Sequence, residues 1–263
     1  MDRETPTRWP DAWVVGRVAT TRPSLRLVCL PQAGAGSGSF TGWRAHLPVG
    51  VELAPVELPG RGTRVADELP GTVDELADQL HVGLAGEFRL PYLLFGHSFG
   101  GMLAYELARR IERDGGRAPL ATVVAASRAP HVEPGDRLGN ADGERLIRWL
   151  VAHDGIPREL FRFPDYLRSA LSAIRADLAL AEAHFVPSPV PLRSALHVLG
   201  GAEDRVVPPG ALGAWSACAA GDFSLTVLDG GHDFPRTRPA AVLGKLKTIL
   251  PPGTWPDEPR KVP

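Results

Sequence analysis

The chain has 263 residues, of which 44% are hydrophobic and 22% charged, and its formal net charge is −1. This composition supports a folded globular protein with a sizeable core. The near-neutral charge argues against a nucleic-acid surface, and no apolar run approaches the roughly 20 residues that span a bilayer. Because residues 1–10 are polar and include acids, they do not resemble a secretory signal. We therefore expect a cytoplasmic protein in which Cys29 and Cys218, which lack metal-ligand spacing, are reduced thiols.

Short apolar runs alternate with helical patterns along most of the chain. The predicted strands are residues 25–30, 51–58, 92–95, 121–126, 195–199 and 223–228. The predicted helices are residues 72–84, 101–113, 141–153, 164–184 and 239–250. Continuously apolar strands separated by helices are typical of a parallel sheet that is covered on both faces. The sequence therefore predicts an α/β fold with a mostly parallel central sheet.

This alternation is interrupted at about residues 129–189, where two predicted helices follow each other without a strand. Such an insertion, placed near the carboxyl ends of the strands where ligands bind, predicts a helical lid. The alternative is an insertion that only packs on the fold. We expect one domain over residues 1–263, with an N-terminal extension at residues 1–24 and a disordered, proline-rich tail at residues 251–263.

Residues 96–100, Gly-His-Ser-Phe-Gly, lie between a predicted strand and a predicted helix. This G-x-S-x-G pattern predicts a serine nucleophile on a tight, strained turn. Side chains at positions 96 and 100 would collide with the adjoining strand and helix, which explains the two glycines. We predict that Ser98 is the nucleophile. Phe99, the next residue, is expected to donate its backbone N–H to the oxyanion.

A serine nucleophile requires a base, and the base requires an acid that orients it. His232 follows the last predicted strand, in the glycine turn of residues 229–232, and is the predicted base. Asp204 follows the preceding strand and is the predicted acid, with Glu203 as its near competitor. The order serine, acid, histidine along the chain is that of α/β-hydrolases.

A glycine-rich loop, residues 31–38, follows the first predicted strand. A tetrahedral oxyanion needs two backbone donors, and we predict that Gln32 supplies the second one, with Ala33 as the alternative. The loop lacks both a following Gly-Lys-Ser/Thr and the spacing of a dinucleotide fingerprint. We therefore expect no nucleotide cofactor.

From about residue 25 to residue 250 the chain resembles the type II thioesterases of polyketide and nonribosomal peptide assembly lines. The blocks that carry the resemblance are residues 30–36 (LPQAGAG), 58–64 (LPGRGTR), 96–101 (GHSFGG), 127–130 (SRAP), 155–157 (GIP), 174–177 (IRAD) and 230–232 (GGH). The second block and the sixth, which lies in the predicted lid, make the resemblance specific.

The resemblance implies an α/β-hydrolase fold with a helical lid. It also implies a monomeric enzyme that needs no metal or other cofactor. The implied activity is release of stalled or aberrant acyl groups from the phosphopantetheine arms of acyl or peptidyl carrier proteins. From the residues alone, a general carboxylesterase or lipase on the same triad and a non-catalytic binding module stay open as alternatives.

Two departures from the family pattern lie near the predicted triad. The family usually has histidine where Gln32 stands and an aromatic residue where Asp233 stands. We expect glutamine to leave the backbone donor intact and Phe234 to restore the apolar contact.

Four charged residues of the matching blocks have open roles. Arg61 and Arg64 are expected to form a salt bridge within their loop, or alternatively to contact the carrier protein, and Arg175 and Asp177 are expected to fix the lid.

Overall fold

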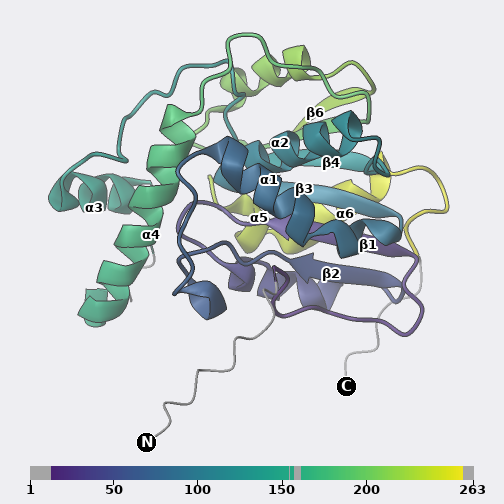
Figure 1. Ribbon diagram of the computed structural model, residues 1–263, viewed down its shortest axis with the longest axis horizontal. Helices are drawn as coiled ribbons and strands as arrows, with labels where there is room; N and C mark the ends of the chain where they lie inside the picture. Colours follow the sequence, from purple (N-terminus) through teal and green to yellow (C-terminus); the bar gives the residue numbers. More distant parts are fainter. Residues whose placement is uncertain (1–12, 154, 157–160, 257–263) are drawn as a thin grey trace, which may run out of the picture.

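A computed structural model describes residues 13–153, 155–156 and 161–256 (Figure 1). Its strands are β1 (Leu25–Leu30), β2 (Val51–Pro55), β3 (Tyr92–His97), β4 (Ala121–Ala125), β5 (Leu196–Gly201) and β6 (Phe223–Leu228). They form one parallel sheet in the order β2-β1-β3-β4-β5-β6. The predicted parallel sheet is confirmed, although β2 ends at Pro55 rather than at residue 58.

The helices also follow the predicted order. They are α1 (Val73–Gly83), α2 (Phe99–Arg113), α3 (Gly143–Ala152), α4 (Pro164–Ala183), α5 (Phe234–Thr237) and α6 (Pro239–Ile249). Shorter 3-10 helices are η1 (Ser37–His46), η2 (Gly62–Arg64), η3 (Ala85–Arg89) and η5 (Pro209–Cys218). Helix α1 begins where predicted, because the Thr72 hydroxyl accepts the Glu75 N–H at 3.1 Å.

Both faces of the sheet are covered, because successive strand residues point to opposite sides. On one face, Leu94, Val124 and Val198 pack against α1, α2 and η5. On the other face, Phe95 and Val123 pack against η1, α5 and α6. Figure 1 shows these helices on either side of the strands. The result is a three-layer α/β fold.

The segment before β1 lies along the open edge of β2. Val15 donates its backbone N–H to Pro55 at 3.1 Å, and Val18 donates to Leu53 at 3.0 Å. Trp13 is only 7% exposed and packs in the core, whereas Trp9 lies outside the described residues. This segment protects one edge of the sheet from pairing with another chain.

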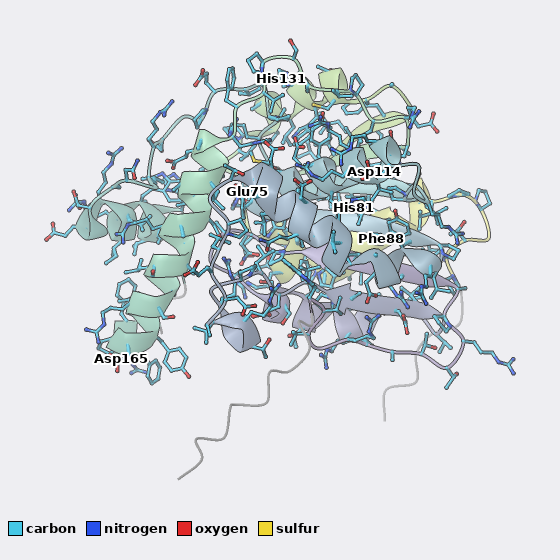
Figure 2. All side chains as sticks on the ribbon, in the orientation of Figure 1. Glu75, His81, Phe88, Asp114, His131 and Asp165 are labelled. Carbon is cyan, nitrogen blue, oxygen red and sulfur yellow. The ribbon has the colours of Figure 1, made fainter. Side chains whose placement is uncertain are left out.

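The insertion between β4 and β5 holds α3 and α4, which lie beside one end of the sheet (Figure 1). Its apolar cluster includes Leu138, Leu146, Leu150 and Ile174 and is separate from the two clusters that flank the sheet. Figure 2 shows Asp165, near the amino end of α4, at the outer tip of that helix. The insertion therefore has a small core of its own.

The last described residues are more ordered than the sequence predicts. Trp255 packs against the core around α6, so the segment from residue 251 to residue 256 is not a disordered tail. Residues 257–263 lie outside the described residues. Among the helices of the described ranges, none has the length and hydropathy needed to cross a membrane.

Candidate active site

The sheet order reverses at β1, which has β2 on one side and β3 on the other. Where the loops after two adjacent parallel strands run in opposite directions, a crevice forms at the carboxyl ends of those strands. The glycine-rich loop follows β1 and the Ser98 turn follows β3, so both border this crevice. The loops after β5 and β6 carry Asp204 and His232 to the same edge.

Ser98 occupies the strained turn that the sequence predicts. Its φ is +53° and its ψ is −114°, an unusual conformation for a residue with a side chain. A Cβ at Gly96 would lie 2.0 Å from the Gly100 carbonyl oxygen, and a Cβ at Gly100 would lie 2.2 Å from the Leu30 carbonyl oxygen. The backbones pack so closely that only glycine fits at either position.

Ser98, His232 and Asp204 form a continuous chain of hydrogen bonds. His232 Nε2 lies 3.0 Å from Ser98 Oγ, and His232 Nδ1 lies 2.9 Å from Asp204 Oδ2. The Asp204 carboxylate is buried, and its Oδ1 also accepts the backbone N–H groups of Val206 and Val207 at 2.8 and 2.9 Å. The carboxylate is thus fixed in place and can hold one imidazole orientation.

His97, which flanks the nucleophile, braces two loops of the site. Burial lowers the pKa of its imidazole to about 3, so the ring is neutral and carries one N–H. Nε2 donates that proton to the His232 carbonyl oxygen at 2.8 Å. Nδ1 then accepts. The Gln32 Oε1 lies 3.2 Å from it, so the Gln32 amide must be turned over for its NH₂ group to donate. The sequence excluded His97 as the base but did not reveal this bracing role.

The predicted oxyanion donors have free backbone N–H groups. Within the described part of the chain, the N–H groups of Phe99 and Gln32 donate to no acceptor, and neither does that of the alternative, Ala33. The N–H of Gly34 is already bound to Asp177. The free donors therefore border the crevice from both the loop after β1 and the start of α2.

A cavity of about 370 Å³ opens above Ser98. Phe99 and Met102 line it from α2, and Leu138, Trp149 and Leu178 are among the residues that line it from the insertion. A second cavity, of about 380 Å³, lies on the other side of the base and is lined by polar side chains. Those side chains include His153, Glu203, Arg205, His232, Asp233 and Arg236.

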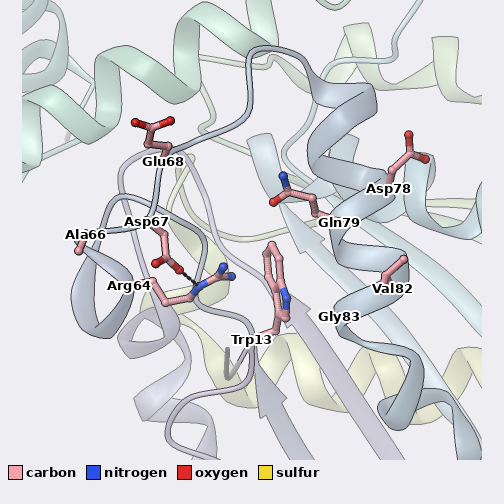
Figure 3. Close-up of a pocket in the computed structure, with 9 residues that line it drawn as sticks. All are labelled: Trp13, Arg64, Ala66, Asp67, Glu68, Asp78, Gln79, Val82 and Gly83. Atoms are coloured by element: carbon pink, nitrogen blue, oxygen red, sulfur yellow. Dashed lines mark hydrogen bonds and ion pairs between the residues drawn. The ribbon is translucent and has the colours of Figure 1, made fainter. Parts of the chain in front are cut away.

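A larger hollow of about 730 Å³ lies between the segment before β1, the loop after β2 and α1 (Figure 3). Arg64 stacks 3.8 Å above the centre of a Trp13 ring and binds Asp67 at 2.7 Å. Among the described residues that line it, none is a serine, cysteine or histidine. These residues therefore do not form a second group like that of Ser98 and His232.

Arg61, Arg64 and Asp177 have defined partners, and one expectation about them is corrected. Arg64 pairs within its own loop as expected, with Asp67. The expectation that Arg61 also pairs within that loop is wrong, because Arg61 binds Asp177 of α4. A partner 116 residues away could not be found from local spacing.

Asp233 stands where the family pattern has an aromatic residue, and Phe234 follows it. Phe234 is fully buried in the core beneath the loop, as expected. Burial raises the pKa of Asp233, although Arg236 opposes this by binding its Oδ2 at 2.5 Å. The acid next to the base is thus held by an arginine.

Among the described residues, no three His, Cys, Asp or Glu side chains gather as a ligand set for a metal ion. Cys29 and Cys218 are buried and unpaired, and burial raises the pKa of both thiols. Neither cysteine takes part in the hydrogen-bonded chain of Ser98, His232 and Asp204.

The family model of the thioesterase domain matches residues 25–250. The chain is 31% identical to thioesterase PikA5 of Streptomyces venezuelae, over 80% of this chain and 75% of that protein. The RedJ thioesterase of the prodiginine biosynthetic pathway in Streptomyces coelicolor has a TM-score of 0.80 at 31% identity, covering 87% of this chain and 91% of RedJ. YbtT, a type II thioesterase from the yersiniabactin biosynthetic pathway, has a TM-score of 0.81 at 27% identity, covering 90% of this chain and 97% of YbtT. The chain therefore belongs to the thioesterase family, as a type II thioesterase with the α/β-hydrolase fold that hydrolyses thioesters.

Proposed function

We propose that this enzyme, acting as a monomer, removes stalled or aberrant acyl groups from the phosphopantetheine arms of acyl or peptidyl carrier proteins. One observation carries the proposal: the hydrogen-bonded chain from Ser98 through His232 to Asp204 lies beside a cavity whose lining includes apolar side chains. The family membership and the biosynthetic pathways of RedJ and YbtT support a carrier-bound substrate.

Ser98 Oγ attacks the thioester carbonyl carbon while His232 Nε2 takes the hydroxyl proton. Asp204 holds the ring and stabilises the imidazolium. The N–H groups of Phe99 and Gln32 bind the oxyanion of the tetrahedral intermediate. When the intermediate collapses, the C–S bond breaks and His232 returns the proton to the leaving thiolate. The carrier thiol departs and leaves an acyl ester on Ser98.

Deacylation repeats these steps with water as the nucleophile. His232 removes a proton from a water molecule, the resulting hydroxide attacks the ester, and the proton passes back to Ser98 Oγ. The products are the free acid and the regenerated serine. We place the acyl group in the 370 Å³ cavity, because its lining includes apolar side chains from α2 and the insertion.

The test is a panel of acyl groups loaded on a carrier protein, with acid release followed by intact mass of the carrier. Acyl-carrier thioesters should be hydrolysed faster than the same acyl groups on a small thiol or in an oxygen ester. Ser98→Ala should lower kcat on the order of 10⁴- to 10⁶-fold and abolish labelling by a fluorophosphonate probe. Faster cleavage of oxygen esters would favour a general carboxylesterase. No cleavage together with no labelling would favour a binding module.

A further inference from the structure

A buried ion pair joins α4 of the insertion to the loop after β2. Asp177 is 0% exposed and Arg61 is 7% exposed. Arg61 Nη2 donates to Asp177 Oδ1 at 2.7 Å, and Arg61 Nη1 donates to Asp177 Oδ2. A charged pair this deeply buried needs close geometry on both sides, since an unpaired buried charge is strongly unfavourable.

The guanidinium of Arg61 is fixed at all five of its N–H groups. Two of them bind Asp177, and two more, from Nε and Nη2, bind the Pro59 carbonyl oxygen at 3.2 and 3.1 Å. The fifth binds the Ala35 carbonyl oxygen, in the loop after β1, at 3.3 Å. Arg61 therefore connects three segments: its own loop, α4 and the loop that carries the proposed oxyanion donor.

Asp177 also reaches that loop directly. Its Oδ2 accepts the Gly34 N–H at 2.7 Å. Gly34 has a φ of +73° inside a turn that the Ala35 N–H closes onto the Gln32 carbonyl oxygen at 3.1 Å. Ile174, one helical turn before Asp177, fits against the same turn, because a Cβ on Gly34 would lie 2.1 Å from its Cγ1. One face of α4 thus holds the turn by packing and by charge.

We propose that Asp177 and Arg61 are positioning residues for the oxyanion donor. They fix the turn of residues 32–35, so that the Gln32 N–H is aligned with the substrate carbonyl only while α4 packs against the loop. The proposal rests on the proposed function, since it concerns the same oxyanion. Catalysis depends steeply on such alignment, and a displacement of about 1 Å can lower a rate about 100-fold.

Two variants separate positioning from folding. Asp177→Asn keeps an acceptor for Gly34 but leaves the Arg61 charge without its partner. The double variant Asp177→Leu with Arg61→Met removes both charges and fills the space with apolar atoms, an exchange that is often neutral for stability. In both variants we expect kcat on carrier thioesters to fall about 10- to 100-fold while KM changes less than about threefold.

The matched control is Glu52→Gln. Glu52 is also buried and paired with an arginine, since its Oε2 binds Arg26 Nε and Nη2 at 2.9 and 2.6 Å. It lies on β2, and among the described residues its side chain bonds to Arg26 and Arg17, both outside the loop after β1. It should lower stability and leave kcat unchanged. An equal loss of kcat in Glu52→Gln would overturn the positioning role, as would a double variant with wild-type kcat.

Hydrogen exchange gives a readout that does not depend on activity. Peptides covering residues 30–38 should exchange faster in both Asp177 variants than in the wild-type enzyme or in Glu52→Gln. Unchanged exchange in these peptides would refute the link between α4 and the turn. If the wild-type enzyme cleaves no carrier thioester, the proposed function fails, whereas the exchange comparison still decides whether α4 holds the turn.

Discussion

Helices α2 and α4 both line the cavity above Ser98, yet they are buried to very different degrees. α2 buries 12 of its 15 residues, and it begins directly after the nucleophile. α4 has 20 residues and buries only Ile174, Asp177 and Leu180, a single stripe at three-residue intervals. Ser98 therefore stands at the start of a helix that is buried over most of its length, whereas α4 has only a narrow stripe of fully buried residues.

The site needs rigidity most on the side of Ser98. The serine and its acid must keep distances of about 3 Å to one imidazole, and packing on the central sheet enforces them. If the acyl group enters the cavity as proposed, the wall must admit it and release the product, which is easier for a helix with few buried contacts. We therefore expect changes on the sheet side to abolish chemistry or folding. Changes at the α4 residues that line the cavity should instead tune substrate choice.

The largest effect on the sheet side is expected for Asp204→Asn. The amide would still fill the space, but it would favour the wrong imidazole tautomer, so kcat should fall about 10⁴-fold with little change in stability. Steady-state kinetics on a carrier thioester measures this. A loss smaller than about tenfold would mean that another group, such as Glu203, orients His232.

Gly100→Ala tests how tightly α2 is fixed. The new Cβ would lie 2.2 Å from the Leu30 carbonyl oxygen, between two backbones that cannot move apart easily. We expect the free energy of unfolding, measured in urea, to fall by about 3 kcal/mol or more. Gly213→Ala, whose Cβ would meet nothing within 4 Å, is the control and should change it by less than about 1 kcal/mol. Equal stability of both variants would contradict the close packing.

His97 makes the stability of the folded protein sensitive to acid. Its pKa is about 3 in the folded protein, because of burial, and near 6.5 in the unfolded chain. As the pH falls below about 6.5, the unfolded chain binds the proton first, so the free energy of unfolding should drop by about 1.4 kcal/mol per pH unit toward pH 3. This contribution is fully present above about pH 7.

His97→Gln removes that titration. The free energy of unfolding, measured in urea at pH 7, 6, 5 and 4, should depend less on pH than in the wild-type enzyme. The difference in slope should correspond to the uptake of up to one proton. The same slope in both proteins would show that His97 is not held neutral.

The smallest effect is expected at a cavity-lining residue of α4. Leu178→Ala enlarges the cavity by removing a half-buried side chain from its lining. The ratio of kcat/KM for a longer to a shorter acyl group should rise about tenfold, the scale at which apolar pockets discriminate methylene groups. Leu171→Ala, on the same helix and absent from the cavity lining, is the control. An equal shift in both variants would place the acyl group elsewhere.

The sheet side could be predicted from the sequence much better than the contacts of α4. The strands are predictable from their apolar runs. Ser98, Asp204 and His232 are predictable because each lies shortly after such a strand, so local patterns place it at the sheet edge. The pairing of Arg61 with Asp177 is not predictable in this way, because the two residues are 116 positions apart and meet only when α4 docks. The same holds for His97, whose contacts with Gln32 and the His232 carbonyl depend on three loops at once.

The position of the base after the last strand has a consequence for the growing chain. Ser98 and His232 are 134 residues apart, and the loop that carries His232 follows β6, which pairs with β5. A chain that is still being synthesised, or a fragment that ends before β6, has the serine without its predicted base. We therefore expect no hydrolytic activity before the chain is complete through His232.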